Sequence, residues 1–115
     1  MPALFACKKI DLYDIMRCSF GLTKTEHKIL LNLLKSESEN SVKSISAELS
    51  LERSTVQKAI KTLIKKGLIE RKQYNLDEGG FRFYYHSIPK QDIKQKLLKS
   101  VRDWHSSVER MIDKW

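Results

Sequence analysis

The chain has 115 residues, of which 41% are hydrophobic, and its formal net charge is +8 at neutral pH. This length predicts one domain, residues 1–115, and the hydrophobic content excludes a disordered chain. No apolar run approaches the roughly 18 residues of a membrane span and the N-terminus lacks a secretory pattern, so we expect a cytoplasmic protein without membrane partners.

Two helices are predicted in the first third of the chain. Residues 8–20 place Ile10 and Tyr13 on one side of an N-terminal helix. The segment Thr23–Glu26 then has the Ser/Thr-x-x-Glu pattern of a capping box, and a periodic apolar run follows it directly. This run predicts a second helix that ends near Ser36.

The next two predicted helices are joined by a tight turn of three residues. Residues 42–49 form a short helix and residues 53–66 a longer one, in which apolar positions recur every three or four residues. The side chains expected to face the core in the longer helix are Val56, Ile60, Leu63 and Ile64. Two helices joined by so short a turn are the helix-turn-helix unit.

The apolar period changes from helical to two after Gly67. Residues 68–76 and 81–87 read as strands around a turn, which predicts a β-hairpin directly after the second helix of the unit. Such a hairpin makes the helix-turn-helix winged. A final helix, opened by a proline, is predicted over residues 89–115. The predicted fold class is therefore mainly α with a small β-hairpin: a winged helix-turn-helix over residues 22–88, flanked by N- and C-terminal dimerisation helices.

The basic charge peaks inside one helix, because residues 53–66 carry five basic side chains and no acid. Residues 44–71, SISAELSLERSTVQKAIKTLIKKGLIER, resemble the winged-helix region of MarR-type and archaeal TrmB-type transcription regulators. The resemblance lies in the apolar spacing and in Gly67-Leu68-Ile69 before a basic strand, and it covers about residues 22–88. It implies a prokaryotic, and by resemblance archaeal, regulator that binds double-stranded DNA. The chain departs from the pattern at Glu52, because such proteins usually place Ser, Asp or Asn there as the helix N-cap.

A helix fits the major groove of DNA, and its N-terminal half reaches the base edges. Ser54, Thr55, Gln57 and Lys58 are the candidates for base contacts. Lys61 and Lys65 lie further along and are candidates for phosphate contacts, which position a protein without reading sequence. The acidic turn Asp77-Glu78 repels phosphate, so Lys72 and Arg82, on the strand flanks, are expected to make the DNA contacts of the wing. The complete set of predicted DNA-binding residues is Arg53, Ser54, Thr55, Gln57, Lys58, Lys61, Lys65, Arg71, Lys72 and Arg82.

The basic side of the helix predicted over residues 53–66 allows other interpretations. It could be a solvated surface, which is common on helices, although the neighbouring tight turn and hairpin favour DNA binding. The chain could also be a winged-helix protein-interaction module that meets an acidic partner, or a nucleoid protein that binds duplex DNA without sequence preference. Sequence-specific transcription regulation is the preferred hypothesis.

The last predicted helix carries apolar residues spaced 4, 3, 4, 3 and 4 apart, which is an a/d heptad pattern over nearly three heptads. Two tryptophans in an exposed seam need a partner, so we expect a homodimer, with some packing against the N-terminal helix. A twofold dimer would present two recognition helices to two DNA half-sites. The predicted interface residues are Ile10, Tyr13, Leu97, Val101, Trp104, Val108, Met111 and Trp115.

Nothing in the sequence predicts an enzyme, a metal site or a cofactor. His27, His86 and His105 are scattered, and Cys7 and Cys18 form neither a zinc motif nor an intrachain disulfide if one helix carries both. The resemblance to MarR-type regulators allows a small-molecule effector of unknown identity, whereas the sugar-binding domains of longer TrmB-type proteins have no counterpart here.

Overall fold

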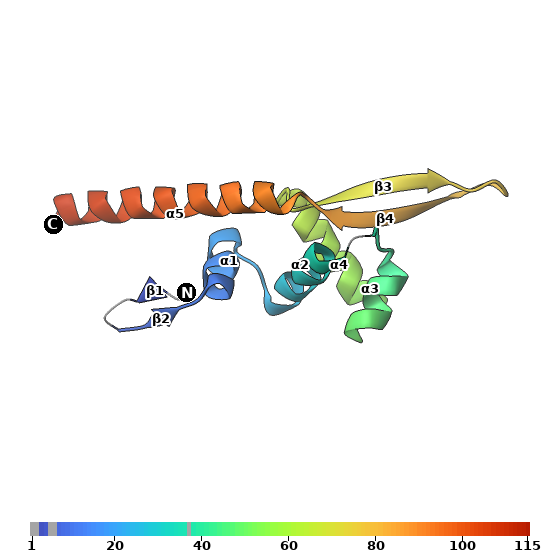
Figure 1. Ribbon diagram of the computed structural model, residues 1–115, viewed down its shortest axis with the longest axis horizontal. Coiled ribbons are helices and arrows are strands. Elements are labelled where there is room, and N and C mark those ends of the chain that lie inside the picture. The colour runs from blue at the N-terminus through green and yellow to red at the C-terminus, as the bar shows by residue number, and fades with distance from the viewer. Residues whose placement is uncertain (1–2, 5–6, 37) are drawn as a thin grey trace. The chain divides into compact units, whose positions relative to one another are not determined.

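The computed structural model describes residues 3–4, 7–36 and 38–115 of the chain (Figure 1). The chain divides into two compact units. One unit holds residues 1–22 together with 91–115, and the other is continuous from residue 23 to residue 90. The predicted fold class is confirmed, because the structure is mainly helical with a small antiparallel hairpin.

Three helices and the hairpin form the continuous unit. Helix α2 spans Lys24–Lys35, α3 spans Val42–Leu49 and α4 spans Arg53–Lys65. The predicted capping box opens α2, since the hydroxyl of Thr23 accepts from the backbone N–H of Glu26 (3.2 Å) and the Glu26 carboxylate accepts from the N–H of Thr23 (3.0 Å). These two bonds satisfy N–H groups that a helix start leaves open, so the helix boundary is set locally.

The hairpin is formed by β3, Ile69–Asn75, and β4, Phe81–Ser87, which pair antiparallel from Ile69 opposite Ser87 to Asn75 opposite Phe81. It projects as a long ribbon from the helices at its base (Figure 1). Asn40 extends the sheet by a bridge on the free side of β4, exchanging backbone hydrogen bonds of 3.0 and 2.8 Å with Tyr85. The segment between α2 and α3 is therefore attached to the wing.

The core of this unit lies where the three helices meet the base of the hairpin. Each element contributes apolar side chains that are almost completely excluded from water, and burial of each stabilises the fold by about 1.5–3 kcal/mol. The buried apolar residues are Ile29, Leu30, Leu33, Ile45, Val56, Ala59, Ile60, Leu63, Leu68, Ile69, Tyr85 and Ile88.

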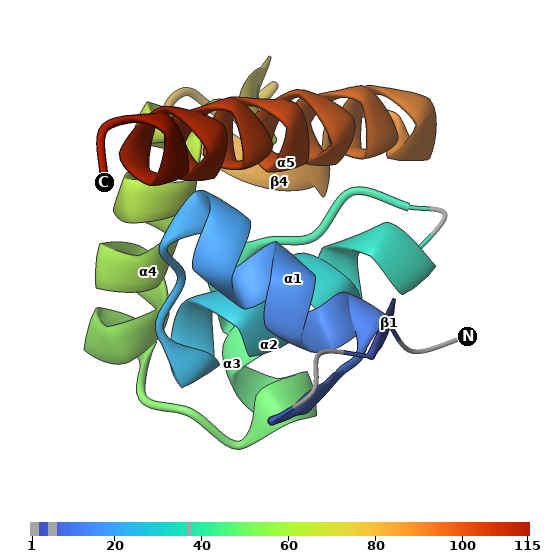
Figure 2. The same ribbon diagram turned by 90° about the vertical axis from the view of Figure 1, so that its left-hand side faces the viewer.

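The other unit contains a short hairpin and two helices, α1 over Leu12–Phe20 and α5 over Lys90–Asp113. The hairpin strands, β1 (Ala3–Leu4) and β2 (Lys9–Ile10), pair antiparallel. Figure 2 shows α1 running beneath the long α5. Met16, Ile93 and Leu97 are buried, while the second half of α5 is exposed almost throughout.

Two predictions about the helices were wrong. The N-terminal helix begins at Leu12 instead of residue 8, because Asp11 and Asp14 form a capping box through bonds of 2.9 and 3.2 Å. Cys7 consequently lies before β2, outside the helix that holds Cys18, and both thiols are exposed. In α4, Ile64 is 37% exposed instead of buried. Each residue advances about 100° around a helix, so Ile64 lies about 40° beyond Ile60, at the edge of the exposed basic face.

Candidate nucleic-acid interface

The exposed face of α4 carries nearly all of the residues predicted to contact DNA on this helix. Arg53, Ser54, Gln57, Lys58, Lys61 and Lys65 are exposed, and Thr55 is half-buried. They occupy an arc because Val56, Ala59, Ile60 and Leu63 hold the opposite side of the helix in the core. The helix therefore presents three lysines, one arginine and two neutral hydrogen-bonding side chains on one surface.

The turn between α3 and α4 fixes how this surface is presented. Ser50 adopts a left-handed conformation (φ 54°) as the C-cap of α3, and the backbone N–H of Leu51 donates to the carbonyl of Ser46 (3.1 Å). The Ser46 hydroxyl also donates to the carbonyl of Leu51. Glu52 is the N-cap of α4 but makes no side-chain capping bond. The start of α4, the recognition helix of the helix-turn-helix unit, is thus held by the turn and not by a side chain at its N-cap.

The hairpin of β3 and β4 is the wing, and its strand pairing places the basic side chains Arg71, Lys72 and Arg82 on two different faces. Side chains alternate along a strand, and residues opposite each other share a face. Arg71, opposite Tyr85, therefore shares a face with Ile69, which packs into the core. Lys72 and Arg82 fall on the other face, because Lys72 lies opposite Tyr84 and Arg82 lies opposite Tyr74.

A hollow of about 750 Å³ brings one wing cation next to the recognition helix. Lys61 and Lys65 line it from α4, Arg71 lines it from β3, and its apolar wall includes Ile64 and Ile69. The guanidinium of Arg71 also lies over the ring of Phe83, 4.3 Å from its centroid. This cation–π contact restricts the Arg71 side chain, which lines the same hollow as the two lysines.

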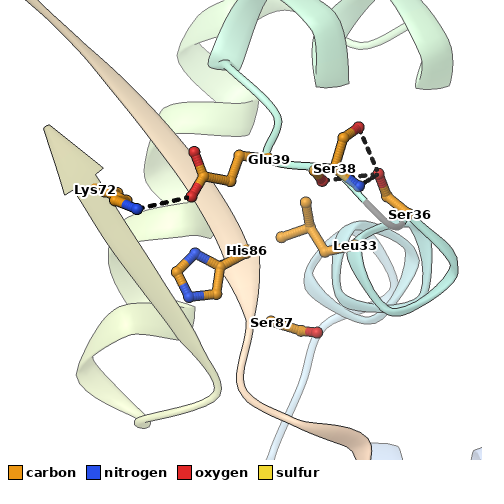
Figure 3. A pocket seen from close by; sticks show the side chains of 7 residues that line it. All are labelled: Leu33, Ser36, Ser38, Glu39, Lys72, His86 and Ser87. Atoms are coloured by element: carbon orange, nitrogen blue, oxygen red, sulfur yellow. Dashed lines mark hydrogen bonds and ion pairs between the residues drawn. The ribbon is translucent and has the colours of Figure 1, made fainter. Parts of the chain in front are cut away.

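Lys72 lies in a different hollow, of about 410 Å³, on the opposite face of the wing. Its ammonium nitrogen is 3.7 Å from the carboxylate of Glu39, which comes from the segment between α2 and α3 (Figure 3). The Tyr74 hydroxyl donates to the other oxygen of the same carboxylate at 2.7 Å. Tyr74 and, secondarily, Glu39 raise the pKa of Lys72 above its ordinary value, so this side chain remains a cation at any physiological pH.

Two residues that attach the wing to the segment between α2 and α3, Glu39 and Asn40, were not predicted from the sequence. The signals available were weak, because an acid and an amide in a polar loop are ordinary loop residues. Their partners lie about 35 to 45 positions further along the chain, beyond the reach of local patterns.

Among the described residues there is no group of three or more histidine, cysteine or acidic side chains that could hold a metal ion. No helix in this part of the chain is both long and apolar enough to cross a membrane.

A basic helix exposed after a tight turn, with a hairpin beside it, defines a winged helix-turn-helix protein. The chain belongs to the TrmB family, because the family model described as "Sugar-specific transcriptional regulator TrmB" matches its residues 16–91. A protein of Methanocaldococcus jannaschii named uncharacterized protein MJ1503 is 29% identical over 107 residues, covering 93% of this chain and 80% of the relative.

Solved structures agree with this assignment. A possible transcriptional regulator from Methanosarcina mazei Go1 has a TM-score of 0.89 at 29% identity, covering 100% of this chain and 97% of its own. Staphylococcus aureus MarR, solved with salicylate and kanamycin, shares the fold at a TM-score of 0.57 and 19% identity, over 87% of this chain and 65% of that one. The expected resemblance to both types of regulator is confirmed, and this chain is a DNA-binding transcription regulator with archaeal homologues.

Proposed function

We propose that the chain is a sequence-specific, double-stranded DNA-binding transcription regulator that acts as a homodimer. The observation that carries this proposal is the one-sided surface of α4, where six exposed polar or basic side chains sit opposite a fully apolar face. The N-terminal half of α4 enters the major groove, and the lysines of its C-terminal half meet the phosphates beside it.

Arg71 supports this arrangement because it lines the same hollow as Lys61 and Lys65. Three cations from two elements line this hollow together with one acid, Glu70, whose carboxylate lies 3.2 Å from the ring of His86. The excess of positive charge favours an anionic partner. Arg82 lies on the other face of the hairpin and is proposed to reach the backbone from there.

The homodimer is proposed to form through α5. Beyond the predicted a/d positions, Leu98 and Ile112 are also exposed, so the apolar surface is wider than a two-stranded coiled-coil seam. Three apolar positions in seven are typical of helices that pack in a bundle. Leu97 is already buried within the chain, whereas Val101, Met111 and Trp115 are exposed and available to a second copy.

Lys61→Ala and Lys65→Ala are each expected to weaken duplex binding about tenfold at 0.1 M salt, to a similar extent on any DNA sequence. Each loss removes one phosphate contact, so the slope of log K against log salt should become shallower by about 0.9. Fluorescence anisotropy titrations at four or five salt concentrations measure both quantities. A variant whose slope equals that of the wild type would place that lysine away from the phosphates.

Gln57→Ala is expected to change sequence preference instead of general affinity. A glutamine amide pairs with adenine through two hydrogen bonds, and each such pair contributes about 1–3 kcal/mol of discrimination. Binding selection from a randomised duplex library, performed with wild type and variant, compares the recovered motifs. Recovery of the same motif by both proteins would remove Gln57 from base readout.

The salt titrations and the library selection together separate the proposed regulator from the two alternative functions. A nucleoid protein would bind duplexes tightly with no enriched motif in the selection. A protein-interaction module would bind no duplex at any salt concentration. A regulator gives both a steep salt dependence and a recovered motif.

A further inference from the structure

The carboxylate of Glu39 joins two parts of the continuous unit that are far apart in sequence. One of its oxygens accepts a 2.7 Å hydrogen bond from Tyr74, and the other lies 3.7 Å from the ammonium of Lys72. Both partners belong to the same face of β3. We propose, on the basis of the DNA-binding function above, that Glu39 is a positioning residue that fastens the wing and so keeps Arg71 beside Lys61 and Lys65.

The attachment has a second point next to Glu39. Asn40 exchanges two backbone hydrogen bonds with Tyr85 of β4, which fixes the base of the hairpin on one strand. Glu39 reaches past this strand to the outer strand β3, so the two neighbouring residues hold both strands of the wing. Lys72 additionally lies over the ring of Tyr74, at 5.2 Å from the centroid, which keeps the two partners of the carboxylate together.

Fixing both strands sets the twist of the hairpin relative to α4. Arg71 precedes Lys72 and lies on the opposite face of β3, so a rotation of this strand that carries Lys72 away from Glu39 also shifts Arg71 relative to the lysines of α4. Beyond its first residues the hairpin has little else to hold it, because residues 70–82 are exposed throughout. A wing without the Glu39 contacts would spend part of its time in orientations unable to place Arg71 on DNA.

This role also reassigns Lys72, which the sequence suggested as a DNA contact. Its ammonium faces an acid of the same chain, Glu39, whereas Arg82, on the same face of the wing, has no ion-pair partner among the described residues. Lys72 therefore acts through Glu39 on the orientation of the wing, and Arg71 makes the phosphate contact.

Four variants test the proposal: Glu39→Ala, Glu39→Gln, Tyr74→Phe and Lys72→Met. Glu39→Ala and Tyr74→Phe are expected to weaken duplex binding about three- to tenfold, because only the fraction of wings in the fastened orientation binds productively. A double variant that combines Glu39→Ala with Tyr74→Phe should bind no more weakly than Glu39→Ala alone, since both changes remove the same hydrogen bond. Glu39→Gln should stay within about twofold of wild type, because its amide oxygen still accepts from Tyr74.

Salt dependence and folding separate positioning from other roles. Lys72→Met is expected to leave the salt slope unchanged, whereas loss of a true phosphate contact lowers it by about 0.9. The thermal midpoints of all four variants should match the wild type, since Lys72 and Tyr74 are exposed and Glu39 is only half-buried, outside the apolar core. Glu78→Ala, which removes an exposed acid at the hairpin turn, is the control for the general effect of charge and should bind equally well or more tightly.

A measurement without DNA keeps this proposal distinct from the function on which it rests. Amide ¹⁵N relaxation of residues 70–75 and 81–86 in the free protein should show a more mobile hairpin in Glu39→Ala and Tyr74→Phe than in wild type or Glu39→Gln. Equal mobility in all variants, a shallower salt slope for Lys72→Met, or wild-type affinity of Glu39→Ala would each overturn the positioning role. Absence of duplex binding by the wild type would instead overturn the DNA-binding function.

Discussion

Met111→Glu is expected to weaken self-association at least 100-fold, while the fold of each chain is unchanged. Met111 is 71% exposed in the single chain, so a carboxylate there remains hydrated in the monomer. In the proposed interface it would be enclosed among Val108 and Trp115, and burial of an unpaired charge costs several kcal/mol. Twofold symmetry introduces this cost twice in each dimer.

Sedimentation velocity across a range of protein concentrations measures the dissociation constant directly. Ser106→Glu is the matched control, because residue 106 lies about half a turn away from the apolar seam and takes the same charge on an exposed surface. Met111→Glu should also reduce affinity for a duplex with two half-sites much more than affinity for a single half-site. Unchanged sedimentation of Met111→Glu, with a wild type that is dimeric, would move the interface away from this face of α5.

Leu63→Ala is expected to lower the free energy of unfolding by about 2–5 kcal/mol, a large part of the 5–15 kcal/mol that holds typical domains together. The Leu63 side chain lies on the core-facing side of the recognition helix α4 and is fully buried. Truncation removes apolar contact and leaves a cavity that the surrounding helices fill only partly. Denaturant unfolding followed by circular dichroism measures the loss.

Ile64→Ala provides the matched comparison, since it removes a side chain of similar size from the adjacent position. Ile64 is 37% exposed and alanine favours helix, so we expect a cost below about 1 kcal/mol. Similar costs for the two variants would mean that Ile64 is covered in solution. A cost below 1 kcal/mol for Leu63→Ala would contradict the packing of α4 itself.

The elements of the fold were predictable from the sequence because their signals are local. The Thr23–Glu26 capping box requires only residues three apart, and the structure confirms both of its bonds. The turn at residues 77–80 ends in two glycines with positive φ, which lets the two strands reverse direction within a few residues. The N-terminal helix was placed too early because Asp11 and Asp14 form an equivalent box that the apolar spacing alone did not reveal.

The edges of the buried stripe on α4 depend on the tertiary structure. Apolar spacing indicates which side of a helix faces the core, but Ile60 and Ile64 are both isoleucines on nearly the same side. Only the packing of α2, α3 and the hairpin determines how far around α4 the core extends. It covers Ala59, which the sequence pattern did not select, and stops short of Ile64.

The sequence by itself determined the winged helix-turn-helix, the basic side of its second helix and the residues that could meet DNA there. The register of the hairpin placed Arg71 and Lys72 on opposite faces of the wing. Only the tertiary structure decided which face adjoins α4, because the burial of Ile69 turns Arg71 toward Lys61 and Lys65. It likewise paired Glu39 with Tyr74 and Lys72, since contacts between residues more than thirty positions apart depend on how the elements pack and leave no local pattern in the chain.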